Sequence, residues 1–122
     1  MKEVKFNELV NKTIFDISIN RENDEIVFSC TDDTMYLMYH ETDCCETVTI
    51  EDICGDIQDL INSPVIQAFE TTNSDNPKHK EYEDSFLWTF YTITTIKGTV
   101  TLRWYGESNG YYSESVSFMK IQ

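Results

Sequence analysis

The chain has 122 residues, 40% hydrophobic and 13% aromatic, which is enough apolar material for one domain with its own core and too little for two. Its 22 acidic and 9 basic residues give a formal net charge of −13, which argues against nucleic acid and anionic membranes as partners, because both require cationic contacts. The sequence has no run of eighteen apolar residues and no apolar leader, so we expect a cytoplasmic protein.

The first part of the chain predicts a short helix and a three-stranded meander. The short helix is expected around Phe6 to Val10. Apolar and polar residues then alternate with the period of two that is typical of half-buried strands. The predicted strands span 15–19, 26–30 and 35–41. Asp32 and Asp33 form a predicted two-residue turn, which would place Cys30 opposite Met35 on the core face.

The next segment carries the main helix of the predicted fold. Thr49 stands three residues before Asp52, a spacing that resembles a capping box. Apolar residues follow at the i, i+4, i+7 and i+8 positions of one helical stripe. The stripe consists of Ile53, Ile57, Leu60 and Ile61. Pro64 lies just beyond the expected end of the helix.

The rest of the chain predicts four more strands, with the basic residues Lys78 and Lys80 in a polar loop after the first of them. These strands span 65–72, 86–96, 99–105 and 112–121. The Asn109-Gly110 pair is a strong hairpin signal, so the last two strands are expected to pair. We therefore expect one α+β domain over residues 1–122, with one main helix packed on a curved antiparallel sheet of about six to seven strands. A two-sheet sandwich with an appended helix is the alternative.

Four potential zinc ligands lie within fifteen residues of one another. They are His40, Cys44, Cys45 and Cys54. Cysteines in a chain without an export signal are expected to be reduced or metal-bound, and adjacent cysteines make a poor disulfide. We therefore expect a structural zinc site, in which Asp43, Asp52 or Asp56 could replace one ligand. Core packing is the competing explanation for Cys54, and Cys30 is expected in the core.

The acidic residues are concentrated in one interval. Between Arg21 and Lys78 there is no Lys or Arg, while the interval holds fourteen Asp and Glu residues. Such a segment either keeps a surface solvated or binds a basic partner. The predicted partner contacts are Glu41, Asp43, Glu46, Glu51, Asp52, Asp56 and Asp59, together with two tyrosines, Tyr105 and Tyr111, of the type that anchors interfaces. Trp104 and Tyr112 are instead expected to pack across strands.

The sequence does not predict an enzyme. His40 next to Cys44 or Cys45 could form a Cys-His pair, but nothing else in the chain supports catalysis. The sequence contains no Gly-rich phosphate loop, no G-x-S-x-G and no H-E-x-x-H motif. We expect a binding protein.

Three segments resemble motifs of an uncharacterised family of small domains from phages, prophages and their bacterial hosts. They are YHETDCCE at 39–46, DICGD at 52–56 and WYGESNGYYS at 104–113. This resemblance implies no particular activity.

By type, a small acidic chain of this kind also resembles anti-CRISPR proteins, specifically inhibitors of a type II effector nuclease. That resemblance implies that carboxylates of the 41–59 segment bind the nuclease and block target-DNA loading in the bacterial host, while a structural zinc rigidifies the turn that presents them. The alternative is a metal-binding accessory domain with no nuclease partner.

Overall fold

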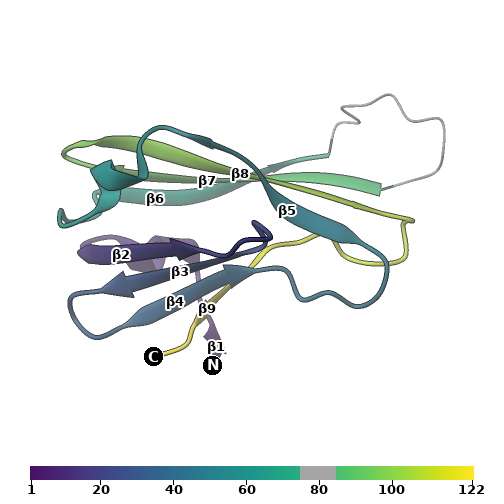
Figure 1. Cartoon of the computed structure of the whole chain (residues 1–122), viewed down its shortest axis with the longest axis horizontal. Helices are drawn as coiled ribbons and strands as arrows, with labels where there is room; N and C mark the ends of the chain where they lie inside the picture. Colours follow the sequence, from purple (N-terminus) through teal and green to yellow (C-terminus); the bar gives the residue numbers. More distant parts are fainter. Residues whose placement is uncertain (75–84) are drawn as a thin grey trace.

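The computed structural model describes residues 1–74 and 85–122, so the basic residues Lys78 and Lys80 lie outside the described part. Two antiparallel sheets stack face to face (Figure 1). One sheet has the strand order β1-β9-β4-β3-β2 and the other β5-β8-β7-β6. The strands are β1 (Lys2–Glu3), β2 (Ile14–Ile19), β3 (Glu25–Cys30), β4 (Met35–Tyr39), β5 (Thr47–Cys54), β6 (Gln67–Asn73), β7 (Ser85–Thr95), β8 (Gly98–Ser108) and β9 (Ser117–Lys120).

The prediction of an α+β fold with a main helix is wrong. The helical elements of the described chain are two short 3-10 turns, η1 (Phe6–Leu9) and η2 (Ile57–Leu60). The short helix expected around Phe6 to Val10 is only the 3-10 turn η1, whereas the β2-β3-β4 meander is confirmed. The protein is therefore nearly all β. The alternative prediction, a two-sheet sandwich with an appended helix, is right about the two sheets and wrong about the helix.

Side chains from both sheets form one core. Trp104 of β8 is fully buried, and its Nε1–H lies 3.2 Å from Sδ of Met38 on β4, so the indole reaches a partner in the opposite sheet. Phe118 of β9 stacks on Tyr36 with ring centroids 5.1 Å apart. Replacing a buried aromatic such as Trp104 with Ala typically costs about 3–5 kcal/mol. Trp104 lies opposite Ile50 and Thr89 of the neighbouring strands, whereas Tyr112 lies in the connection between β8 and β9, so the prediction of cross-strand packing holds for Trp104 alone.

The predicted helix from residue 49 is strand β5 followed by η2, and the expected apolar stripe is divided between them. Ile53 lies on β5, whereas Ile57 and Leu60 belong to η2. These residues pack against the same core, so apolar side chains recur at helical spacing although the strand is extended. A β-bulge also interrupts β5, where Ile50 pairs with Trp104 and Asp52 with Arg103, so Glu51 is an extra residue. Gly55, at φ +109°, then turns the chain into η2.

The turn between β3 and β4 has three residues, where two were predicted. Cys30 N–H donates to the carbonyl of Thr34 at 2.9 Å, and Asp33 adopts φ +68°, as in a hairpin whose loop ends in a left-handed residue. The extra residue shifts the register by one. Met38 therefore faces the core, and His40, two residues later, lies on the same side. Cys30 is buried, as expected.

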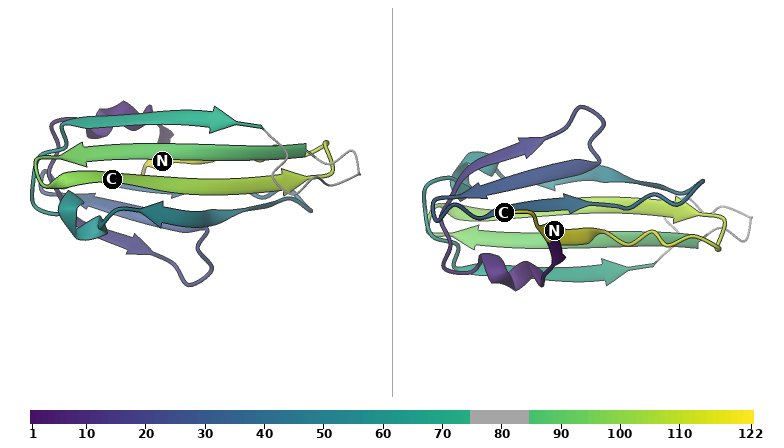
Figure 2. Two further views of the ribbon diagram at one scale, coloured as in Figure 1. Left: turned by 90° about the horizontal axis from the view of Figure 1, so that it is seen from above. Right: turned by 90° about the horizontal axis from the view of Figure 1, so that it is seen from below.

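The chain crosses between the sheets twice at the same end of the molecule. Residues 40–46 lead from β4 to β5, and residues 109–116 lead from β8 to β9 (Figures 1 and 2). The predicted hairpin at Asn109-Gly110 is therefore wrong, because β9 pairs with β1 and β4 and not with β8. We call the two segments together the crossover end. It unites two of the three motifs that the sequence singled out.

Candidate functional site

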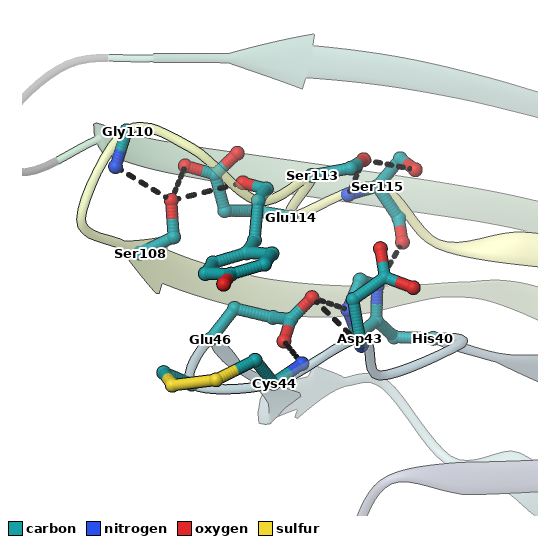
Figure 3. Close-up of polar contacts among 11 residues, drawn as sticks. His40, Asp43, Cys44, Glu46, Ser108, Gly110, Ser113, Glu114 and Ser115 are labelled. Carbon is teal, nitrogen blue, oxygen red and sulfur yellow. Dashed lines mark hydrogen bonds and ion pairs between the residues drawn. A yellow bond between two sulfur atoms is a disulfide. The ribbon is translucent and has the colours of Figure 1, made fainter.

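The crossover end is held together by a histidine between its two segments. His40 Nδ1 lies 2.6 Å from the carbonyl oxygen of Ser115, and Nε2 lies 3.1 Å from Oε2 of Glu46 (Figure 3). The ring therefore bridges the two crossover segments. The His40 side chain is 4% exposed and that of Glu46 is 0% exposed. The pair is thus a buried polar contact.

Glu46 is also tied to the backbone of its own loop. Its Oε1 accepts from the N–H of Cys44 at 2.9 Å, and its Oε2 accepts from the N–H of Asp43 at 3.2 Å. These interactions lower the pKa of Glu46 to about 2: the Cys44 amide contributes most, burial opposes it, and the amides of Glu46 and Asp43 and the His40 side chain add to it. The carboxylate therefore fixes the shape of residues 40–46.

A second buried carboxylate, Glu114, holds the other crossover segment. Ser108 Oγ lies 3.1 Å from Oε1 of Glu114 and accepts from the N–H of Gly110 at 3.1 Å (Figure 3). Gly106 permits this close approach, because a Cβ atom there would lie 2.7 Å from Cβ of Glu114. Both motif-bearing segments thus contain a buried acid that organises a loop, a role that the sequence did not reveal.

The structure does not bring the four predicted zinc ligands together. Cys44 and Cys45 are joined as a disulfide, in contrast to the expectation that this pair is reduced or metal-bound. Cys54 is exposed at the far end of β5, about 23 Å from the start of that strand at ~3.3 Å per residue. Both ring nitrogens of His40 have other partners. The residues therefore do not fit a four-ligand zinc site, and zinc stays a prediction for elemental analysis.

The remaining potential metal ligands of the described residues are also dispersed. Within residues 1–74 and 85–122, no three His, Cys, Asp or Glu side chains are grouped so that they could hold one ion. The predicted alternatives, in which Asp43, Asp52 or Asp56 replaces one zinc ligand, therefore also lack a site among these residues. A shallow hollow of about 200 Å³ does open beside His40. It is lined by His40, Glu41, Asp43, Ser113, Ser115 and Ser117.

The predicted partner contacts fall into an exposed and a buried set. Five carboxylates are exposed, on β5 and in the segments that precede and follow it, and we call them the acidic edge: Glu41, Asp43, Glu51, Asp52 and Asp56. Glu46 and Tyr105 are buried, so neither can meet a partner directly in this conformation. Asp59 is half-buried beside Gly98, whereas Tyr111 is 88% exposed.

A neighbouring turn adds carboxylates to the acidic edge. β5 is the outermost strand of its sheet, and the N–H of Ile50 donates to the carbonyl of Asn23 at 2.7 Å. This bond holds the β2-β3 turn, with exposed Glu22 and Glu25, against the middle of β5. Segments that are distant in sequence therefore concentrate negative charge on one side of the sandwich.

Sequence reasoning missed a third feature, on the outer face of the four-stranded sheet. Trp88 and Phe90 of β7 point away from the core, and Arg103 of β8 lies beside them. The signal was present in residues 86–93, because apolar side chains occupy both phases of the alternation there. A strand that is apolar on both faces indicates that its outer face is either covered or forms an apolar surface.

Comparisons with other proteins identify the family but no function. Among the described residues, no helix is long and apolar enough to cross a membrane. No curated protein and no solved structure matches the chain. The model of one family, described as a domain of unknown function (DUF7448), matches residues 7–118. The chain therefore belongs to the DUF7448 family, whose domain covers nearly all of it.

Proposed function

We propose that this protein is a non-catalytic inhibitor that binds a basic protein surface through its acidic edge. The proposed partner is a type II CRISPR effector nuclease in the cytoplasm of a bacterial host. The observation that carries the proposal is the set of exposed carboxylates on β5 and in the segments on either side of it, on a chain with a net charge of −13. Such nucleases hold their guide and target in a positively charged channel, where a set of carboxylates can compete with DNA phosphates.

Protection of an open sheet edge is the simpler explanation for part of this charge. Charged residues on an outermost strand discourage pairing with another chain, and Glu51 and Asp52 serve that purpose on β5. Glu41, Asp43 and Asp56 lie outside the strand, where no ladder needs protection. These three exposed acids therefore remain unexplained by edge protection, and they favour an additional binding role.

The other two functions considered have less support. A metal-binding accessory domain would need ligands that converge, and Cys54 lies at the opposite end of β5 from Cys44 and Cys45. A Cys-His enzyme would need a ring nitrogen of His40 directed at sulfur, whereas both nitrogens have oxygen partners. The geometry therefore supports binding rather than catalysis.

Cleavage of target DNA by a guide-loaded type II nuclease tests the proposal. We expect the protein to block cleavage when it is added before target DNA in several-fold excess. The double variant Glu41→Lys/Glu51→Lys should inhibit at least about tenfold less well, and inhibition should weaken as salt is raised. Neither side chain makes a hydrogen bond or ion pair within the described residues, so the fold should persist.

A matched control separates the acidic edge from net charge. Glu3→Lys/Asp16→Lys changes the net charge by the same amount, using exposed carboxylates of the other sheet. This variant should inhibit as well as the wild type. Unchanged cleavage in the presence of excess wild-type protein would rule out the nuclease as partner, and equal loss in both variants would show that only total charge matters.

A further inference from the structure

The outer face of the β5-β8-β7-β6 sheet carries aromatic side chains where a solvated face would carry polar ones. Trp88 and Phe90 are half-buried on this face, and Phe69 of β6 is 40% exposed. In Figure 1 the face forms the upper surface of the molecule, and no described strand or turn lies on it as a third layer. The face is therefore an apolar surface next to the acidic edge.

Trp88, Phe90 and the neighbouring Arg103 build a defined hollow rather than a flat patch. The guanidinium of Arg103 lies over the Trp88 ring, with Cζ 5.4 Å from the ring centroid, and its Nη2 lies 3.6 Å from Oδ2 of Asp52. Phe90 is the cross-strand neighbour of Arg103. Together with Asn73, these residues line a hollow of about 230 Å³. The hollow is open to solvent and has an aromatic floor.

One polar atom in the hollow is unsatisfied. The Nε–H of Arg103 is buried and has no hydrogen-bond acceptor among the described residues. Buried donors without acceptors are uncommon in folded proteins, and each has a cost. An oxygen atom of a bound molecule that displaces the guanidinium slightly would satisfy this donor.

The neighbouring charges indicate which kind of molecule fits. Glu51 and Asp52 of β5 border the face on one side, and both are exposed. Nucleic acid and acidic proteins would meet these carboxylates with like charge, and a second copy of this chain would bring its own net charge of −13. Trp and Arg are the residue types that most often dominate binding energy at protein interfaces. A basic segment with an apolar side chain satisfies both features.

We propose that the outer face of the β5-β8-β7-β6 sheet is the docking surface for a basic protein segment, which inserts an apolar side chain between Trp88 and Phe90 while its Lys or Arg residues meet Glu51 and Asp52. This inference rests on the proposed function in requiring a basic partner. It adds the part of the surface that supplies affinity, since exposed carboxylates mainly provide steering and selectivity.

Two synthetic peptides of equal charge test the docking surface without the nuclease. One alternates Lys and Leu, and the other alternates Lys and Ser. We expect the Lys-Leu peptide to bind the wild-type protein at least about tenfold more tightly, and Trp88→Ala/Phe90→Ala to abolish the difference. Phe15→Ala removes a 52% exposed aromatic from the other sheet and should leave the difference intact.

Tryptophan fluorescence provides a second measurement on the unmodified protein. Of the two tryptophans, Trp104 is fully buried, so accessible emission comes from Trp88. The Lys-Leu peptide should protect this emission from acrylamide quenching, and the Lys-Ser peptide should not. Equal binding of the two peptides, or unchanged quenching by acrylamide, would overturn the inference whether or not the double variant folds.

The nuclease assay distinguishes failure of this inference from failure of the proposed function. If wild-type protein inhibits cleavage and folded Trp88→Ala/Phe90→Ala inhibits equally well, the inference is wrong and the inhibitor function stands. If the peptide preference and its loss in the variant are observed but the nuclease is unaffected, the docking surface stands and the nuclease is the wrong partner.

Discussion

Glu46 and Glu51 are five residues apart and occupy opposite environments. Glu46 is buried at the crossover end, where it accepts hydrogen bonds from two backbone amides of its loop and contacts His40. Glu51 is the extra residue of a β-bulge and is exposed on the acidic edge. The difference shows that a uniform acidic stretch of sequence contains carboxylates that hold the fold and carboxylates that face a partner.

The same contrast extends to the surroundings of each group. The crossover end is a set of mutually satisfied polar contacts between two loops, so a change there alters the shape of both. Glu51 and Asp52 of the acidic edge lie on a strand whose position is set by its pairing with β8, so these side chains can change without altering the backbone. The buried carboxylates of the crossover end should therefore govern stability, and the exposed carboxylates of β5 should govern binding.

Replacing each glutamate with glutamine gives the largest expected difference. Glu46→Gln removes the charge and puts an NH2 group among donors, which leaves buried N–H groups without an acceptor. We expect its thermal midpoint to fall by several degrees. Glu51→Gln should change the unfolding free energy by less than about 0.5 kcal/mol. Thermal and urea unfolding of the two variants measures both, and equal midpoints would show that Glu46 does not organise the loop.

Acid titration of stability sharpens the same comparison. The pKa of Glu46 is lowered from 4.5 to about 2, so its stabilising contribution is complete above about pH 4.5 and is lost as the pH falls toward 2. Urea unfolding between pH 6 and pH 2 should show a steeper acid decline for the wild type than for Glu46→Gln. Glu51→Gln should follow the wild-type curve. A Glu46→Gln curve parallel to that of the wild type would contradict the assignment.

Thiol labelling tests the state of the cysteines at the crossover end. Cys54 is exposed and free, Cys30 is buried, and Cys44 and Cys45 are bonded to each other. The folded protein should therefore show one fast-reacting thiol, and a mild reductant should raise the number to three. Mass spectrometry after alkylation counts them.

Elemental analysis of the same preparation tests the zinc prediction. Three fast thiols without reductant would indicate that the pair is reduced in the purified protein. About one zinc per chain would instead show that the ligands converge differently from this structure.

Tyr111 provides the smallest expected effect. It is 88% exposed in the segment between β8 and β9, whereas Tyr105 is 7% exposed on β8. Tyr111→Ala should change the unfolding free energy by no more than about 0.5 kcal/mol. Urea unfolding checks this, and a larger loss would place the Tyr111 ring in contact with the rest of the protein.

The strands were easier to predict than their connections. Period-two alternation located the meander and the long strands β7 and β8. It failed at β5 and η2, because Ile53 of the strand and Ile57 and Leu60 of the following turn pack against one core at helical spacing. It also failed at Asn109-Gly110, because a local turn signal does not say which sheet receives the next strand.

The candidate site shows the same limit. The sequence identified the motif segments and the acidic residues, and it placed Cys30 in the core. It could not separate buried Glu46 from exposed Glu51, since burial depends on the 109–116 segment that arrives from another sheet. Nor could spacing show that Cys54 lies far from Cys45, because an extended strand carries residues apart about twice as fast as a helix does.

The sequence by itself determined the size of the domain, its negative charge, most of its strands and its membership of the DUF7448 family. Tertiary structure alone decided that two sheets share one core, that two loops distant in sequence form the crossover end, and that Trp88, Phe90 and Arg103 share an outer face. The physical reason is that alternation and charge are local properties of a chain, whereas burial and convergence depend on which strands pair.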